Sequence, residues 1–186
     1  MISIDVESGL IRDARQVPSI NCDDRPPGCE PVLIILHCIS LPPGEFGGQW
    51  IDLFFSNQLD PNAHSYFREI ADQRVSSHLL IRRDGELVQY VPLGKRAWHA
   101  GESCFDGRTK CNDFSIGIEL EGEDDVPYSD EQYDVLCRTI SMLCDAFPSL
   151  VDAPVVGHSD VAPERKTDPG PAFDWLRFRN QLAEKG

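Results

Sequence analysis

The sequence predicts an α/β fold with a central mixed β-sheet flanked by α-helices. Three stretches carry this prediction: an unbroken apolar run at 31–36, a strict apolar/polar alternation at 114–121 and an amphipathic pattern at 129–147. The first is typical of a strand buried on both faces, the second of a strand with two unlike faces, and the third of a helix packed on a sheet. The 186 residues are enough for one domain with its own core, so we expect a single domain over residues 1–186.

The chain begins with residues 1–30, a turn-rich stretch that predicts an irregular arm laid over the domain. The apolar strand follows and ends on His37. Residues 40–72 then predict a loop and helix excursion with two short helices, at 49–56 and 62–71. Excursions of this length between strands often form a wall or lid over a site.

Residues 75–91 predict a β-hairpin, because an Asp-Gly turn signal at Asp84 and Gly85 separates two apolar stretches. In the alternating strand that follows, two sets of side chains face opposite sides. The apolar set is Ile116, Ile118 and Leu120, and the other set is Gly117, Glu119 and Glu121.

The clearest helix spans 129–147. Ser129 and Gln132 form a capping box at its start, and Pro148 ends it. One apolar stripe predicts the face that packs on the sheet; it contains Tyr133, Leu136, Cys137, Ile140, Leu143, Cys144 and Phe147. A second helix is expected from about Ala172, with Trp175, Phe178 and Leu182 on one face.

The composition restricts the compartment and the partners. A net charge of −14 argues against nucleic acid as a partner and disfavours a peripheral membrane role. No run of eighteen apolar residues is present, so we expect no membrane span. The first seven residues lack a basic region followed by an apolar core, so we expect no secretory signal. The seven cysteines include no Cys-x-x-Cys pair, which favours free thiols in a cytoplasmic protein. We also expect the protein to be a monomer.

Two histidines mark the ends of predicted strands. His37 closes the first apolar run, and His158 follows a short apolar run at 153–156 and opens a proline-punctuated loop at 157–170. In open α/β sheets ligands bind at the carboxyl ends of strands, so the two imidazoles converge if their strands are neighbours. With Asp168 they offer two nitrogens and one carboxylate, which leaves a fourth zinc position open for water, as in catalytic sites. The alternative is that each histidine is simply a hydrogen-bonded residue at a strand end.

Glu119 is the candidate general base, because it lies on the strand face that is not apolar. Glu121 lies on the same face and competes for the role, and either residue could instead be an exposed strand carboxylate. Lys166 lies two residues before Asp168, so the two side chains share a side of an extended segment. Its ammonium group could stabilise a developing oxyanion, although a solvated loop lysine is the alternative.

The remaining candidates are Trp98 and three further histidines. Trp98 could stack on a substrate ring or be partly buried packing. We expect His64, His78 and His99 to be structural rather than metal ligands, although His99 could line the pocket.

Five blocks of the sequence, in this order, resemble one known family. They are residues 36–44, 83–86, 98–101, 112–122 and 157–170. The family is that of the cytosolic 1,6-anhydro-N-acetylmuramoyl-L-alanine amidases of Gram-negative bacteria, which are zinc amidases related to phage lysozyme-type amidases and to peptidoglycan recognition proteins. The resemblance covers residues from about 10 to 180 and therefore nearly the whole chain.

This resemblance implies a Zn²⁺ ion held by His37, His158 and Asp168, with Glu119 and Lys166 as the catalytic pair. It also implies an anhydromuropeptide substrate, which is cleaved at the amide between the lactyl group of the anhydro sugar and L-alanine of the stem peptide. The implied reaction belongs to peptidoglycan recycling. When it fails, muropeptides accumulate and induce β-lactamase.

The resemblance further implies that Arg74 and Trp98 contact the substrate, with His99 beside them. Cys38 stands where the family carries Asn, and Lys110 where it carries Arg, and both are expected at substrate-contact positions. A thiol lacks the hydrogen bonds of an amide, and Lys lacks the bidentate fork of Arg, so we expect these departures to alter affinity or specificity rather than the reaction.

Two rival functions are compatible with the same sequence. One is a muropeptide-binding or sensor module without catalysis, which would tolerate loss of the metal ligands or of Glu119. The other is a zinc peptidase that cuts within the stem peptide, which the masses of the products would distinguish from an amidase.

Overall fold

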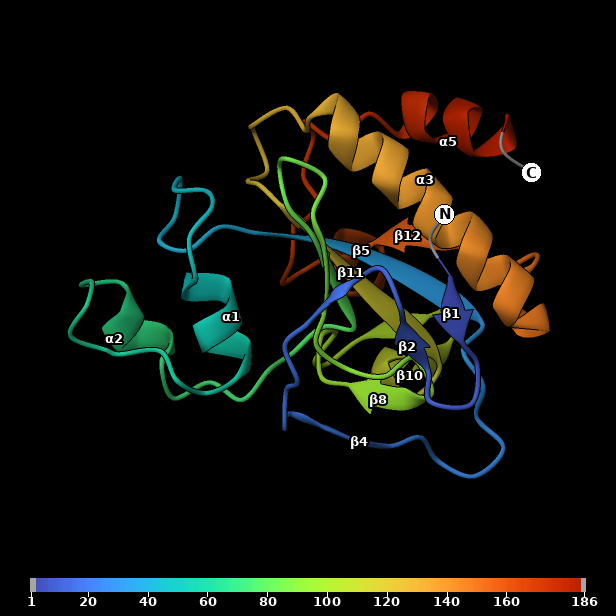
Figure 1. Ribbon diagram of the computed structural model, residues 1–186, viewed down its shortest axis with the longest axis horizontal. Coiled ribbons are helices and arrows are strands. Elements are labelled where there is room, and N and C mark those ends of the chain that lie inside the picture. The colour runs from blue at the N-terminus through green and yellow to red at the C-terminus, as the bar shows by residue number, and fades with distance from the viewer. Residues whose placement is uncertain (1–2, 185–186) are drawn as a thin grey trace.

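A six-stranded mixed β-sheet forms the centre of the molecule (Figure 1). The structure is a computed structural model, and it describes residues 3–184. In spatial order the strands are β12 (Val155–Gly157), β5 (Leu33–Ile39), β11 (Ser115–Glu121), β6 (Leu79–Ile81), β7 (Leu87–Gln89) and β3 (Arg15–Gln16). The predicted fold class is confirmed, and the predicted hairpin is the antiparallel pair of β6 and β7.

The strands β12, β5, β11 and β6 run parallel, so their carboxyl ends lie at one edge of the sheet. The register pairs His37 of β5 with Glu119 of β11, and Leu36 of β5 with Gly157 of β12. Since His158 directly follows Gly157, the pairing brings the two histidines side by side. The condition for their convergence, that their strands are neighbours, is therefore met.

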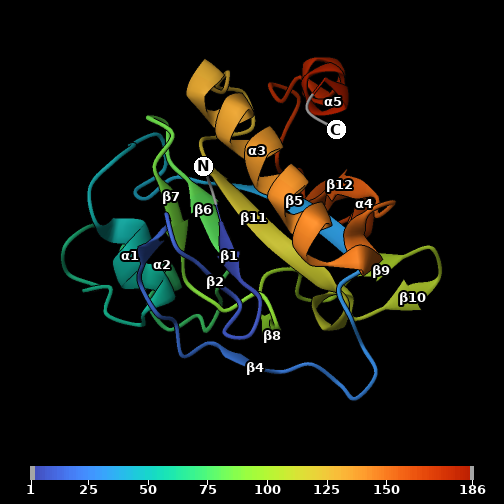
Figure 2. The ribbon, with the colours of Figure 1, turned by 45° about the vertical axis from the view of Figure 1, so that its right-hand side comes forward.

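Helix α3 (Asp130–Ala146) covers one face of the sheet, and α5 (Trp175–Ala183) packs on α3 (Figure 2). The predicted capping box is present, since the Ser129 hydroxyl accepts the backbone N–H of Gln132 at 3.2 Å and the Gln132 side chain accepts the N–H of Ser129 at 3.1 Å. The predicted apolar stripe and the apolar set of β11 meet in one core cluster. Within residues 3–184, no helix combines the length and the apolar character that crossing a membrane requires.

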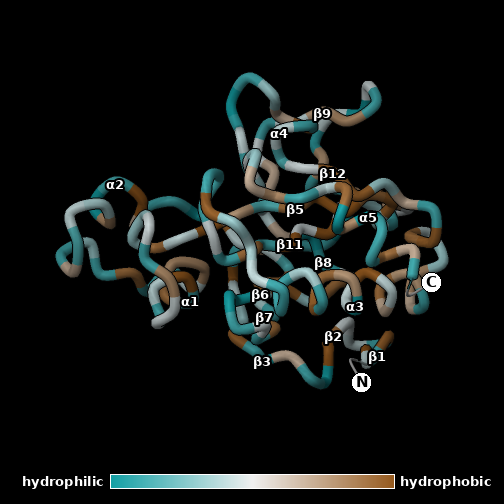
Figure 3. Tube along the Cα trace, turned by 90° about the horizontal axis from the view of Figure 1, so that it is seen from above, coloured by the Kyte–Doolittle hydropathy of each residue, from teal (hydrophilic) through white to brown (hydrophobic). Residues whose placement is uncertain are grey.

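The opposite face of the sheet carries two separate apolar clusters. One packs α1 (Trp50–Phe55) and α2 (Phe67–Ile70) against β6 and β7, at the end of the molecule away from α3 and α5 (Figure 3). The other packs Leu33 and Ile35 of β5 against Ala100, Phe114 and Val161. Because side chains alternate along a strand, His37 points to the same face as Leu33 and Ile35.

Residues 3–30 contain more regular structure than the irregular arm that we predicted. Strand β1 (Ile4–Asp5) pairs with β2 (Leu10–Ile11), β3 joins the edge of the central sheet, and β4 (Cys22–Asp24) pairs with β8 (Lys95–Ala97). The guanidinium group of Arg25 donates to the backbone carbonyls of Asn112, Asp113 and Ser115 and so fastens the arm to the body of the protein. These partners are far away in the chain, which is why the local sequence did not indicate them.

Two features near the histidines differ from the prediction. Strand β5 continues to Ile39, because β11 pairs with it along its whole length, so His37 lies inside the strand and not at its end. The predicted loop at 157–170 contains a one-turn helix, α4 (His158–Val161), which starts at the histidine itself.

The other predicted helices are present but short. The helix predicted at 49–56 is α1, the one predicted at 62–71 is limited to α2, and the one expected from Ala172 is α5. Helix α5 begins late because the Asp174 carboxylate caps it by accepting the N–H of Arg177 at 2.9 Å. The remaining elements are β9 (Cys104–Phe105), β10 (Arg108–Thr109) and the 3₁₀ helices η1 (Cys111–Asp113) and η2 (Pro148–Leu150). None of the seven cysteines forms a disulfide, as expected.

Candidate metal centre and active site

Three side chains from separate segments converge at the carboxyl edge of the sheet. His37 Nδ1 lies 3.0 Å from His158 Nδ1, and each of these nitrogens lies 3.1 Å from Asp168 Oδ2. Both imidazoles are buried, and the Asp168 side chain is 13% exposed. Two nitrogens and one carboxylate oxygen at this spacing could hold one metal ion, and they are ligands that zinc prefers.

Asp168 reaches the histidines because the segment after α4 folds back onto β12. The N–H of Ser159 donates to the backbone carbonyl of Asp168 at 3.0 Å. Gly157 permits this close approach, because a Cβ at that position would lie 2.9 Å from the ring of Pro169. The Asp160 carboxylate accepts the N–H of Gly157 at 2.7 Å and so fixes the start of α4.

Each imidazole has a partner on its other nitrogen. His158 Nε2 lies 3.1 Å from the carbonyl oxygen of Ala100, which can only accept, so Nε2 carries a proton, and Nδ1 faces Asp168. His37 Nε2 lies 2.9 Å from His99 Nδ1. Burial lowers the pKa of His37 to about 4, although the Asp168 carboxylate acts in the opposite direction, so this ring is neutral at pH 7. Two imidazole nitrogens that converge on a carboxylate fit the zinc ion that the sequence predicted.

Glu119 lies beside His37 on the neighbouring strand and lines the same pocket. Its side chain is buried, so the alternative of an exposed strand carboxylate is wrong. Among the described residues, Oε2 of Glu119 has no hydrogen-bond partner. Burial raises the pKa of Glu119 to about 8; the Asp168 carboxylate raises it as well, and Lys166 lowers it. A buried carboxyl group in this state is suited to take up and return a proton near neutral pH.

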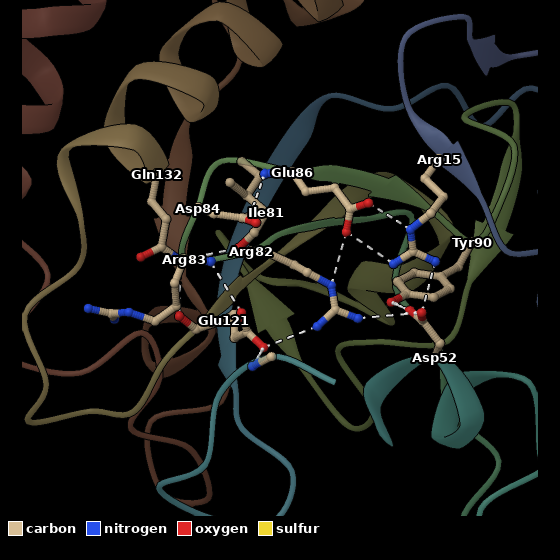
Figure 4. A network of polar contacts seen from close by, with 11 residues as sticks. Arg15, Asp52, Ile81, Arg82, Arg83, Asp84, Glu86, Tyr90, Glu121 and Gln132 are labelled. Carbon is tan, nitrogen blue, oxygen red and sulfur yellow. Dashed lines mark hydrogen bonds and ion pairs between the residues drawn. The ribbon is translucent and has the colours of Figure 1, made fainter. Parts of the chain in front are cut away.

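Glu121, the competing candidate for general base, is engaged in a different network (Figure 4). Its Oε1 accepts from Arg82 at 3.1 Å and from the N–H of Gly47 at 2.6 Å, and its Oε2 accepts from the N–H of Arg83 at 3.2 Å. Glu121 is not among the residues that line the pocket. Of the two carboxylates, Glu119 is therefore the one that lines the pocket together with His37, His158 and Asp168.

A pocket of about 740 Å³ lies over the cluster. The 40–72 excursion contributes a wall, as the sequence predicted, through Ser40, Leu41, Pro43, Phe54, Phe55, Tyr66 and Ile70. The charged side chains of the lining, apart from Glu119 and Asp168, are Glu123, Asp124, Asp125, Arg165 and Lys166. Lys166 thus lies in the same pocket as Asp168, and the positive charges of the lining come from one short segment.

Two of the predicted substrate contacts, Cys38 and His99, line this pocket. The Cys38 thiol lies 3.4 Å from Oδ1 of Asp124 and packs against the core beneath α3. Burial raises the pKa of Cys38, and the nearby carboxylates act in the same direction, so the thiol remains protonated at neutral pH.

The other three, Arg74, Trp98 and Lys110, are not among the lining residues. Arg74 is exposed and donates to the carbonyls of Ala71 and Gln73. The indole N–H of Trp98 donates to Asp23 at 3.3 Å, and Lys110 is exposed. Their contact with substrate stays a prediction.

The sequence did not predict the hydrogen-bond partners of His158 and His99. The Ala100 carbonyl contacts His158, and the Asn112 amide and the Ser115 hydroxyl contact His99, the neighbour of His37. The block at 98–101 pointed to this region, but Asn112 and Ser115 have no local signal, because their roles depend on contacts made only in the folded chain.

Known proteins are similar to this chain in sequence and in fold. Residues 28–171 match the family model described as N-acetylmuramoyl-L-alanine amidase. The chain is 58% identical to the 1,6-anhydro-N-acetylmuramyl-L-alanine amidase AmpD of Enterobacter cloacae, over 95% of this chain and 94% of the relative. It matches the crystal structure of a Se-Met AmpD derivative with a TM-score of 0.93 and 55% identity, over 98% of this chain and 99% of that one. A complex of AmiD from E. coli with anhydro-N-acetylmuramic acid-L-Ala-D-gamma-Glu-L-Lys matches with a TM-score of 0.57 and 28% identity, over 84% and 60% of the two chains.

Proposed function

The chain belongs to the N-acetylmuramoyl-L-alanine amidase family, and we propose that its substrates are 1,6-anhydromuropeptides. As a member of this family it is a hydrolase that acts on an amide bond. The scissile bond joins the lactyl group of 1,6-anhydro-N-acetylmuramic acid to L-alanine of the stem peptide. The name of the Enterobacter cloacae relative specifies the 1,6-anhydro sugar, and the AmiD complex holds an anhydromuramoyl peptide, which supports this choice.

The observation that carries the proposal is the convergence of His37, His158 and Asp168 beside a buried carboxyl group. We assign these three residues to a Zn²⁺ ion, because two nitrogens and one oxygen leave a position free for water or substrate. When bound, zinc supplies Lewis-acid chemistry, by activating water and by polarising a carbonyl group.

Glu119 acts as the general base and then as the general acid. It takes a proton from the attacking water on its unpartnered Oε2 and later delivers a proton to the amine of the departing alanine. Lys166, on the wall of the same pocket, stabilises the negative charge that develops on the substrate carbonyl oxygen. The effect of Lys166 on the pKa of Glu119 supports a position close to the reacting groups.

We place this reaction in the cytoplasm, in peptidoglycan recycling, and we propose that the chain acts as a monomeric single domain without nucleic acid or membrane partners. Seven cysteines without a disulfide support a reducing compartment. Failure of the reaction would let muropeptides accumulate and would raise β-lactamase induction. The β-lactamase activity of a host that lacks this protein is the measurement that tests this setting.

Mass spectrometry of an anhydromuropeptide digest tests the reaction and the metal together. The digest is run with the purified protein as isolated, after treatment with a zinc chelator, and after zinc is restored. We expect free anhydro sugar and intact stem peptide, lost on chelation and recovered with zinc.

Two other outcomes would overturn the proposal. Unchanged substrate in the presence of bound zinc would favour a muropeptide-binding module. Shortened peptides that remain attached to the sugar would indicate a peptidase that cuts within the stem.

A further inference from the structure

A chain of hydrogen bonds runs from His37 away from the metal cluster into the protein. His37 Nε2 lies 2.9 Å from His99 Nδ1, and His99 Nε2 lies 3.2 Å from the hydroxyl of Ser115. The Ser115 hydroxyl in turn donates to the backbone carbonyl of Cys111 at 2.6 Å. Ser115 and Cys111 are buried, so this chain ends in the protein interior and not in solvent.

The last hydrogen bond of this chain determines which atom donates the proton in each of the other hydrogen bonds. The carbonyl of Cys111 can only accept, so the Ser115 hydroxyl uses its single hydrogen there and accepts from His99 Nε2. With its proton on Nε2, His99 has an acceptor at Nδ1, which receives the hydrogen bond of His37 Nε2. The Nδ1 lone pair of His37 is then free to face His158 and Asp168.

We propose that His99 is a positioning residue that holds His37 in the one tautomer that can bind the metal. This inference rests on the metal site of the proposed function and names a residue that acts on that site through His37. In the opposite tautomer His37 Nδ1 would carry the proton and could not be a ligand. In metalloproteins generally, the group that accepts a hydrogen bond from the second ring nitrogen of a metal-binding histidine fixes the tautomer of that histidine.

The neighbouring residue does the same for the other histidine. The Ala100 carbonyl accepts from His158 Nε2, so the two consecutive residues 99 and 100 set the tautomers of both ligands. The side-chain oxygen of Asn112 holds this pair in place, since it accepts the N–H of His99 at 3.1 Å and the N–H of Ala100 at 2.8 Å.

The space for the His99 ring depends on Gly117 in the middle of β11. A Cβ at this position would lie 2.5 Å from Cγ of His99, so any other residue would displace the ring. The ring packs edge-on against His37, with centroids 5.0 Å apart and an interplanar angle of 88°. A glycine inside a buried strand commonly marks such a close approach, and here it admits the imidazole that supports His37.

Zinc affinity, measured by competition with a chromophoric chelator, tests the proposal without reference to activity. His99→Leu removes the acceptor, and we expect it to weaken zinc binding by about 10- to 100-fold. His99→Asn is the matched control: its Oδ1 can take the place of Nδ1 as an acceptor, so zinc affinity should stay within a few-fold of wild type. Equal affinities of wild type and His99→Leu, or equal losses in both variants, would overturn the proposal.

A second measurement decides the proposal if His99→Leu fails to fold. The imidazole ¹⁵N shifts of the metal-free wild-type protein report which nitrogen carries each proton. We expect the Nε2–H tautomer for His37 and His99; a proton on Nδ1 of His99 would overturn the proposal. A wild-type protein that binds no zinc would refute the proposed function itself, whereas zinc binding that is indifferent to His99 would refute only the positioning role.

Discussion

Glu119 illustrates how its surroundings give an ordinary carboxyl group a chemical role. It lies on β11 next to His37, buried, with one oxygen unpaired among the described residues. Burial and the Asp168 carboxylate raise its pKa, and Lys166 lowers it. On the same face of the same strand, Glu121 is engaged by Arg82 and by two backbone N–H groups. Glu119 and Glu121 lie on the same face of one strand but differ in chemical role because their hydrogen-bond partners differ.

Replacing Glu119 tests the proposed base. Glu119→Gln keeps the size of the side chain but cannot accept the proton, so we expect turnover to fall by about two to four orders of magnitude while zinc remains bound. Steady-state rates and metal analysis of the same preparation measure both quantities. Glu123→Gln, also in the pocket lining, is the control and should change the rate far less. Near wild-type turnover in Glu119→Gln would remove this residue from the mechanism.

Arg74 is the residue on which the predicted affinity for an anionic stem peptide depends. It is exposed, and its neighbours Gln73 and Val75 line the pocket. Arg74→Ala should therefore raise KM more than it lowers kcat, because it removes binding that substrate and transition state share. Arg68→Ala, an exposed arginine of α2, is the control. A fall in kcat at unchanged KM would assign Arg74 to the chemistry instead.

His78 makes folding stability depend on pH. Its Nδ1 accepts the N–H of Gly117 at 3.0 Å, and burial, with Arg25 acting in the same direction, lowers its pKa from 6.5 to about 3. As the pH falls below 6.5 the unfolded chain takes up this proton first, so stability is lost progressively down to about pH 3. The slope reaches at most about 1.4 kcal/mol per pH unit for one proton.

Urea unfolding of the chelated protein at several pH values between 7 and 5 measures this contribution. His78→Gln should be less stable than wild type at pH 7, and the difference should shrink as the pH falls, because the variant no longer carries the titrating group. A difference that does not change with pH would show that His78 does not contribute to the slope.

At the scale of elements, a buried arginine connects the pocket wall to the sheet (Figure 4). Arg82, in the turn between β6 and β7, lies 3.1 Å from Glu121 of β11, 3.2 Å from Glu86 and 3.4 Å from Asp52 of α1. Its side chain is only 7% exposed. The hydroxyl of Tyr90 also donates to Asp52. Helix α1, which supplies Phe54 and Phe55 to the pocket, is therefore held by a network as well as by its apolar face.

Removing this arginine should be costly. Arg82→Met leaves the buried Glu121 carboxylate without its cation, since Arg15 bonds only Asp52 and Glu86, and we expect a loss of about 3–5 kcal/mol in the free energy of unfolding, measured in urea. Arg15→Met is the matched control, because Arg15 bonds two of the same carboxylates, Asp52 and Glu86, but is 38% exposed. Its loss should be about 1 kcal/mol or less. Equal effects of the two substitutions would contradict the assignment of the network's strength to burial.

At the scale of the whole molecule, the candidate metal centre joins segments that are far apart in the sequence. His37 and His158 are separated by 121 residues, and Asp168 follows ten residues later. A ligand that binds only the folded arrangement stabilises it in proportion to the logarithm of its free concentration. Bound zinc should therefore stabilise the whole fold and not only the pocket.

Removal of zinc tests this coupling. The Tm measured by calorimetry should fall when the metal is chelated, and the loss corresponds to about 2.7 kcal/mol if free zinc was at 100 times its Kd. Asp168→Asn should weaken the response to zinc, whereas Asp125→Asn, an exposed acid of the pocket lining, should leave it intact. Identical Tm values with and without zinc would contradict the proposed site.

By itself, the sequence determined the features that depend on neighbouring residues. The capping box and apolar stripe of α3 lie within one element, and so do the apolar run of β5, the alternation of β11 and the turn at Gly85. The motif blocks were sufficient to nominate His37, His158 and Asp168 together, and the structure brings these three into one cluster.

Only the tertiary structure decided which partner each side chain meets. Strand order placed β12 beside β5, so the histidines meet, and long-range contacts separated Glu119 from Glu121. The support of His37 by His99 and the fastening of the arm by Arg25 arise in the same way. The physical reason is that periodicity and capping act within a few residues of the chain, whereas burial, charge and hydrogen-bond partners are set by groups that meet only when the chain has folded.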